Sequence, residues 1–143
     1  MKFRVLAIGK PKLRHAADGI ADYQRRLTRS AEVEVQYLKE KDETNQLLDK
    51  SAGTYRIALD ERGERLTTDQ FVDRINSLEL RGDVKTVSFL VGGSDGHPEL
   101  LRRESDMVLS LSSLTLQHEL ALVILLEQLY RAYTIKRGEP YHR

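Results

Sequence analysis

The 143-residue chain contains no cysteine and only three prolines. The absence of cysteine excludes disulfides, thiolate metal sites, iron–sulfur clusters and a cysteine nucleophile. Long apolar runs are also missing: the longest, Leu120 to Leu126, is far shorter than the roughly 20 residues that span a bilayer. The first apolar stretch, Val5 to Ile8, is too short for the core of a secretory signal. We therefore expect a cytoplasmic protein with no transmembrane segment.

An excess of charge of either sign is missing too. Lys and Arg number 23 against 22 Asp and Glu, a formal net charge of +1, so the overall charge argues neither for nor against a nucleic-acid partner. Hydrophobic residues at 40% and charged residues at 31% are typical of a globular protein. The length suits one domain, and no internal repeat or Gly-, Pro- or Ser-rich linker divides it. We expect a single domain over residues 1–143.

Short β-rich runs alternate with helical patterns along the chain. The runs that predict strands are Phe3 to Gly9, Val33 to Leu38, Tyr55 to Asp60, Lys85 to Gly93 and Met107 to Ser112. The spacings that predict helices cover 13–29, Thr68 to Leu80, Pro98 to Ser105 and 118–136. A Thr67-x-x-Gln70 capping box precedes the second of these helices. The alternation predicts an α/β fold, a parallel sheet with helices on both faces.

Two segments do not fit a simple amphipathic pattern. Residues 39–53 are polar and charged, with only Leu47 and Leu48 to bury, which predicts a loop or a short, poorly anchored helix. In contrast, the helix predicted over 118–136 is apolar almost all the way round. Such a helix must be buried on all sides, either by a second protomer or as the central core helix of a monomer. We expect the dimer.

A glycine-rich turn, Gly92-Gly93-Ser94-Asp95-Gly96, follows the fourth predicted strand and precedes a helix. Glycines at the carboxyl end of a strand let a ligand approach the backbone closely, and α/β sheets bind ligands at this edge. The alternative is a tight turn with no ligand.

The same turn matches the Gly-x-Ser-x-Gly motif of α/β-hydrolases, with Ser94 as the nucleophile. A triad requires an acid and a histidine after the serine, and Asp106 or Glu119 with His118 or His142 satisfies that order. The chain is short for a hydrolase and lacks a His-Gly-Gly-Gly oxyanion segment, so a small serine hydrolase is a weaker alternative.

Metal binding is not expected. His118-Glu119 begins like a zincin motif, but Leu122 stands where the second histidine is required. The four histidines show no ligand spacing. The motif search therefore predicts no metal.

Basic residues gather in two parts of the chain. The first cluster comprises Lys10, Lys12, Arg14, Arg25, Arg26 and Arg29. The second comprises Arg131, Lys136, Arg137, His142 and Arg143, with Tyr130, Tyr133 and Tyr141 nearby. Charge together with aromatic stacking is typical of proteins that hold single-stranded or looped RNA, although solvated helix faces are often charged as well.

The chain ends in Tyr141-His142-Arg143. These side chains have the chemistry to stack on a base, accept a proton and hold a phosphate, respectively. His142 is the candidate general base, and Arg143 with its terminal carboxylate group is the candidate for stabilising charge on the base oxygens. The alternative is a frayed terminus without a role.

Six further motifs occur along the chain: VLAIGK at the start, IALD, FLVGGSDG, LSLSSLTLQH, LLEQLYRAYTI and the terminal GEPYHR. Together they resemble the ribosomal RNA large-subunit methyltransferase H family of the SPOUT superfamily. The resemblance implies an S-adenosylmethionine (SAM)-dependent homodimer that methylates the N3 nitrogen of a pseudouridine in 23S rRNA of the large ribosomal subunit. It also implies a C-terminal trefoil knot in the parallel α/β sheet.

The resemblance further places cofactor-binding residues at matching positions of this chain. These are Leu59, Gly92, Leu111, Ser112, Ser113, Leu114, Thr115 and Leu116. The chain departs from the family at Leu122, where members carry an arginine, and in a shortened 39–54 region. A lost activity, leaving a catalytically idle RNA-binding or ribosome-assembly homodimer, is the alternative from another class.

Overall fold

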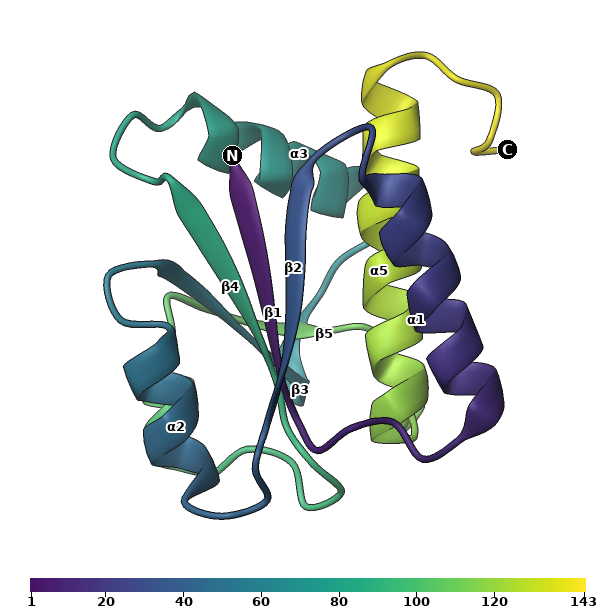
Figure 1. Cartoon of the computed structure of the whole chain (residues 1–143). Helices are drawn as coiled ribbons and strands as arrows, with labels where there is room; N and C mark the ends of the chain where they lie inside the picture. The colour runs from purple at the N-terminus through teal and green to yellow at the C-terminus, as the bar shows by residue number, and fades with distance from the viewer.

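The computed structural model describes residues 1–143 as one sheet between two layers of helices (Figure 1). The strands are β1 (Lys2–Ile8), β2 (Glu32–Leu38), β3 (Tyr55–Arg65), β4 (Thr86–Val91) and β5 (Met107–Ser110). The helices are α1 (Arg14–Leu27), α2 (Glu43–Lys50), α3 (Thr68–Leu80), α4 (Glu99–Arg103) and α5 (His118–Lys136). All neighbouring strands are parallel, in the order β2-β1-β4-β3-β5. The predicted α/β class is confirmed.

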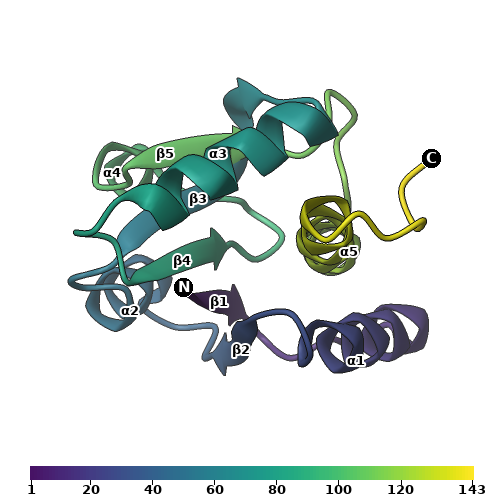
Figure 2. The same ribbon diagram turned by 90° about the horizontal axis from the view of Figure 1, so that it is seen from above.

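The alternation of side chains along β1 produces the two helical layers. Phe3, Val5 and Ala7 are buried in a core with α1, α3 and α5, whereas Leu6 and Ile8 are buried in a smaller core with α2 and α4. Successive side chains of a strand point to opposite faces, so an unbroken apolar strand requires cover on both. Figure 2 shows α2 and α4 on one side of the sheet and α1 and α5 on the other.

The predicted elements are present, with ends shifted by a few residues. The capping box at the start of α3 also forms as predicted. The backbone N–H of Gln70 donates to Thr67 Oγ1 at 3.1 Å, and the N–H of Thr67 donates to Gln70 Oε1 at 2.9 Å. This helix therefore begins where its own sequence specifies.

The segment 39–53 contains α2, which is anchored more firmly than the sequence predicts. Leu47 is 1% exposed and belongs to the smaller core. The Ser51 hydroxyl donates to the Leu47 carbonyl at 2.6 Å and accepts from Arg56 Nε at 2.7 Å. The expectation of poor anchoring was wrong because Arg56 belongs to β3, and a local pattern does not reveal a partner from another element.

Strand β3 continues past its predicted end at Asp60. Leu59 and Glu64 both pair with Leu109 of β5, so residues 60–63 interrupt the ladder. Gly63 lies against the backbone of β5, where a Cβ atom would stand 2.5 Å from the carbonyl carbon and oxygen of Val108. Any side chain at this position must therefore push the two segments apart.

Helix α5 packs against both α1 and α3. Leu122, Leu125, Leu126 and Leu129 are all buried in the larger core. One protomer thus accounts for much of the apolar circumference of α5, and the homodimer and the trefoil knot stay predictions. Leu122, at the position where the resemblance implies an arginine, is 3% exposed. No helix has the length and hydropathy to cross a membrane.

Candidate active site

A cavity of about 450 Å³ lies beyond the carboxyl ends of β3, β4 and β5. Its walls come from residues 59–62, from the glycine turn, from the segment after β5 and from the first turn of α5. Seven of the eight residues predicted to bind a cofactor line it: Leu59, Gly92, Leu111, Ser112, Leu114, Thr115 and Leu116. The eighth, Ser113, is exposed and outside the lining. Three segments far apart in the chain therefore meet around one space.

Gly92 forms the tightest part of the glycine turn. A Cβ atom there would lie 3.1 Å from the carbonyl carbon of Gly96 and 3.2 Å from Cε1 of His97. The His97 ring is buried and forms a 2.7 Å hydrogen bond with the Leu90 carbonyl. Burial lowers the pKa of His97, with the bond to Leu90 opposing that effect in part. His97 is thus a neutral side chain at neutral pH that fastens the turn to β4.

The segment after β5 is held by its own polar side chains. Ser110 Oγ donates to the Ser112 carbonyl at 2.9 Å, and the N–H of Leu114 donates to Ser112 Oγ at 2.9 Å. Thr115 Oγ1 donates to Glu61 Oε2 at 2.9 Å, which links this segment to the end of β3. These bonds fix the segment while Leu114 remains 75% exposed at the cavity.

Charge in the cavity lining is mostly negative. The charged side chains are Asp60, Glu61, Arg62 and Asp95, and no lysine is among the lining residues. An acidic or neutral lining suits a ligand that carries positive charge.

Glu119, at the start of α5, has a structural role. Its Oε1 accepts from the backbone N–H groups of Lys12 and Leu13 at 2.7 and 2.9 Å. Burial acts to raise the pKa of Glu119, but these hydrogen bonds outweigh it and the pKa is lowered. The ionised carboxylate therefore ties the loop between β1 and α1 to the α5 terminus beside the cavity.

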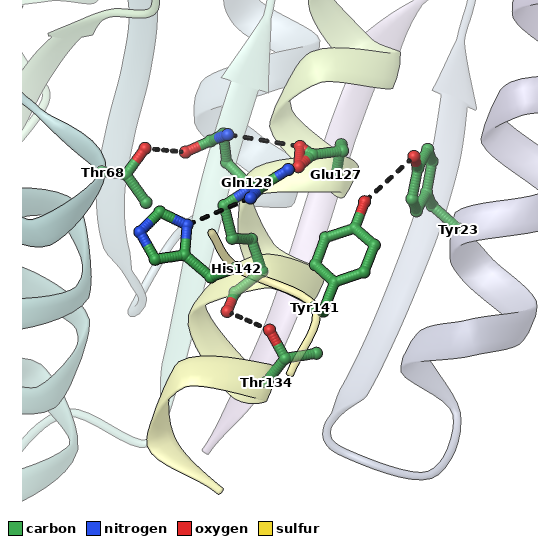
Figure 3. Close-up of polar contacts among 8 residues, drawn as sticks. Tyr23, Thr68, Glu127, Gln128, Thr134, Tyr141 and His142 are labelled. Carbon is green, nitrogen blue, oxygen red and sulfur yellow. Dashed lines mark hydrogen bonds and ion pairs between the residues drawn. The ribbon is translucent and has the colours of Figure 1, made fainter. Parts of the chain in front are cut away.

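The C-terminal tail folds back along the outside of α5 and contacts α1 (Figure 3). The Tyr141 ring packs edge-on to Tyr130, with centroids 4.8 Å apart, and its hydroxyl lies 3.4 Å from that of Tyr23. The Arg131 guanidinium stands 4.7 Å from the Tyr141 ring centroid. Burial, followed by the Tyr23 hydroxyl contact, raises the pKa of Tyr141 to about 12. Tyr141 is therefore a protonated phenol at neutral pH.

His142 is engaged by a hydrogen-bond network on α5 (Figure 3). Arg131 Nη1 lies 3.0 Å from His142 Nδ1, while Arg131 Nε donates to Glu127 Oε1 at 2.7 Å. Because a guanidinium only donates, His142 Nδ1 is the acceptor in this contact. Arg143 is exposed and its side chain makes no hydrogen bond.

The tail and the cavity lie at different levels of α5. His118 lines the cavity, whereas the tail packs on Tyr130 and Arg131. Twelve residues of helix separate His118 from Tyr130, about 18 Å at 1.5 Å per residue. Figure 1 shows the same separation, with the start of α5 at the bottom and the C-terminus near the top. Within one chain the three tail residues do not meet the cofactor residues.

Comparison with known proteins identifies the family. The chain matches the family model described as "Predicted SPOUT methyltransferase" over residues 1–142. It belongs to the SPOUT methyltransferase family. Ribosomal RNA large subunit methyltransferase H of Thermus thermophilus is 47% identical over 143 residues, covering 100% of this chain and 99% of the relative. The Deinococcus radiodurans protein of the same name is 36% identical over 146 residues, with the same coverage.

Solved structures of a methylase family protein and of a methyltransferase share the fold at low sequence identity. A probable methylase family protein from Haemophilus influenzae gives a TM-score of 0.60 at 9% identity, covering 99% of this chain and 70% of that one. A putative methyltransferase from Legionella pneumophila, in complex with SAM, gives 0.55 at 11% identity, covering 92% and 66%.

This SPOUT chain shows no serine-hydrolase triad. Ser94 is exposed and has no hydrogen bond to a histidine. The Asp106 carboxylate accepts from the backbone N–H of Arg56 at 2.8 Å. The Glu119 carboxylate accepts from the backbone N–H groups of Lys12 and Leu13. Of the two candidate histidines, His118 contacts Gln117, with Nδ1 3.5 Å from Gln117 Nε2, and His142 contacts Arg131. No group of three or more His, Asp or Glu side chains is arranged to hold a metal ion.

Some cavity residues of the SPOUT site were not predicted from the sequence. They include Asp60, Glu61, Arg62, Ser110, Gln117, His118 and Ala121. The first four lie at or directly after the carboxyl end of a predicted strand, and that position is the signal that points to them. Gln117, His118 and Ala121 lie at the start of the last helix, where the sequence carries no such signal.

Proposed function

We propose that the protein is a SAM-dependent methyltransferase that methylates the N3 nitrogen of a pseudouridine in 23S rRNA of the large subunit, and that it acts as a homodimer. The observation that carries the proposal is the cavity, which gathers seven of the eight expected cofactor residues at the carboxyl ends of three parallel strands. Its volume, about 450 Å³, is in the range of small-molecule sites. The methyltransferase H relatives and the SAM-bound neighbour support the same assignment.

The residues of the cavity fit this cofactor. Leu59, Leu111 and Leu116 offer apolar surface for an adenine ring, while the glycine turn lets main-chain groups come close. When bound, SAM supplies an electrophilic methyl group on a sulfonium. The absence of lysine from the lining favours that positive charge.

The substrate assignment is supported by cations beside the cavity. Lys10 and Lys12, together with the carboxylates Glu40, Glu43 and Glu119, line a second cavity of about 290 Å³, which shares the residues Gly93 to Asp95 and His118 with the first. Lys10, Lys12 and Arg14 are exposed and form no ion pair in the structure. Unpaired cations at the entrance of a site attract the phosphates of RNA.

The tail supplies the acid–base chemistry of the proposed reaction. Methylation at a ring nitrogen requires its proton to leave, and a histidine is suited to accept it. His142 takes this role once its Nδ1 is released from Arg131. Tyr141 stacks on the base, and Arg143 binds phosphate or stabilises charge on the base oxygens. Because the tail lies about 18 Å along α5 from its own cavity, we place it in the cavity of the second protomer.

Cofactor titration by calorimetry tests the site. We expect one SAM per protomer for the wild type and none for Gly92→Trp, because the new ring has no room beside Gly96 and His97. Ser112→Trp blocks the opposite wall, and Ser94→Ala is the matched control, since it lies in the same lining but should leave binding unchanged. Equal heats for all four proteins would exclude this cavity.

Methyl transfer to ribosomes from a strain lacking the enzyme tests the reaction. The product nucleoside should carry the methyl on N3 of pseudouridine. SAM binding without any transfer to such ribosomes would instead support the idle RNA-binding or assembly protein.

A further inference from the structure

Polar contacts outside the cofactor cavity connect two of its walls. The first wall, residues 59–62, includes Asp60, and the glycine turn of the second wall is followed directly by His97. Arg102, on α4, reaches both. Its Nη1 donates to the His97 carbonyl at 2.7 Å and lies 3.8 Å from Asp60 Oδ2.

Asp60 is a buried carboxylate with few partners. Its side chain is 4% exposed, and Oδ1 accepts from the backbone N–H of Arg62 at 2.9 Å. The guanidiniums of Arg62 and Arg102 supply positive charge at 3.5 and 3.8 Å. A carboxylate removed from water needs such partners, so the position of Arg102 is coupled to that of Asp60.

The glycine turn has no apolar anchor of its own. No residue between Val91 and His97 is buried, and the side chains of Ser94 and Asp95 make no hydrogen bonds. The position of the turn therefore depends on β4 at one end and on His97 at the other. Arg102 is in turn carried by a rigid element, because its neighbour Leu101 is fully buried in the smaller core.

We propose that Arg102 is a positioning residue that holds the glycine turn at a fixed separation from the end of β3 and thereby sets the affinity for SAM. The inference rests on the proposed cofactor site. A cavity whose walls are already in place loses less conformational entropy when the ligand binds. Arg102 acts through His97 and Asp60 and needs no contact with the cofactor.

The test compares Arg102→Met with Arg103→Met, because Arg103 is on the same helix, exposed and free of ion pairs. We expect Arg102→Met to raise the Kd for SAM about tenfold, as expected for one lost charge-assisted hydrogen bond. Arg102→Lys should restore only part of the affinity, because an ammonium keeps the positive charge near Asp60 but does not reproduce the position of the guanidinium Nη1 that contacts both partners. The KM for ribosomes should stay at the wild-type value, as it should for Arg103→Met.

Amide hydrogen exchange of the protein without cofactor gives a second readout. Exchange over residues 92–97 should be faster in Arg102→Met than in Arg103→Met, and unchanged in the sheet. Equal SAM affinity in the two variants would overturn the proposal. It would also be overturned if Arg102→Met exchanged faster throughout the chain and raised the KM for SAM and the KM for ribosomes together. If the wild type binds no SAM, the proposed function fails, whereas unchanged exchange over 92–97 refutes the positioning role by itself.

Discussion

A mixed dimer decides whether the tail of one protomer completes the site of the other. One protomer lacks residues 141–143 but keeps its cavity, and its partner carries Gly92→Trp but keeps its tail. The two are co-expressed with different tags, and the heterodimer is purified through both. Neither homodimer has a complete site, whether the tail acts within its own chain or across the dimer.

The structure indicates that the tail should act on the partner's site rather than on its own. In its own chain the tail is held by Tyr141 against Tyr130 and by backbone bonds of 3.1 Å from Gly138 to Ile135 and 2.9 Å from Glu139 to Thr134. A tail that served its own cavity would have to break these contacts and then cover about 18 Å along α5. Across a two-fold axis, by contrast, one of the two sites of the heterodimer is complete.

We expect the heterodimer to methylate ribosomes at about half the wild-type rate per dimer, because one site of two is intact. The homodimer lacking residues 141–143 should bind SAM nearly as the wild type does and lose about 10²–10⁴ in rate, the usual contribution of a general base. Thermal denaturation of each variant verifies folding. A heterodimer as inactive as its parent homodimers would refute action across the dimer, and sedimentation as a monomer at micromolar concentration would refute the dimer itself.

Two further predictions concern stability. Glu119→Gln should reduce the free energy of unfolding by about 1.5–3 kcal/mol at pH 7, the usual range for hydrogen bonds to a charged group. Because the pKa of Glu119 is lowered on folding, this stabilisation is present above its unfolded value of 4.5 and is lost as the pH falls through the folded value. Urea denaturation should therefore show a smaller difference between the two proteins at acidic pH, and a constant difference would contradict the assigned bonds. Gly63→Ala should cost about 1–3 kcal/mol, since its Cβ would lie 2.5 Å from the Val108 backbone. Gly82→Ala is the control, because nothing lies within 4 Å of a Cβ atom at that position. Equal melting temperatures for the two variants would show that β5 moves aside without a loss of stability.

The sequence by itself determined the elements and the faces they bury. The alternation of strand and helix patterns predicted a sheet covered on both faces, and Phe3 and Leu6 of β1 indeed belong to opposite cores. The capping box at Thr67 and the glycine turn at Gly92 were also predictable, because the signals lie within a few residues of each other. The resemblance to the methyltransferase family, in turn, identified seven of the 20 residues that line the cavity.

Only the tertiary structure decided which elements meet and what their polar groups do. Glu119 was a candidate catalytic acid in the sequence, yet it binds the backbone of Lys12, 107 residues away. The apolar circumference of α5 suggested a second protomer, whereas α1 and α3 of the same chain cover much of it. Tyr141 rests against Tyr23, 118 residues away, at a different level of α5 from the cavity. The physical reason is that periodicity records whether a side chain is shielded from water, and it carries no information on the partner that shields it.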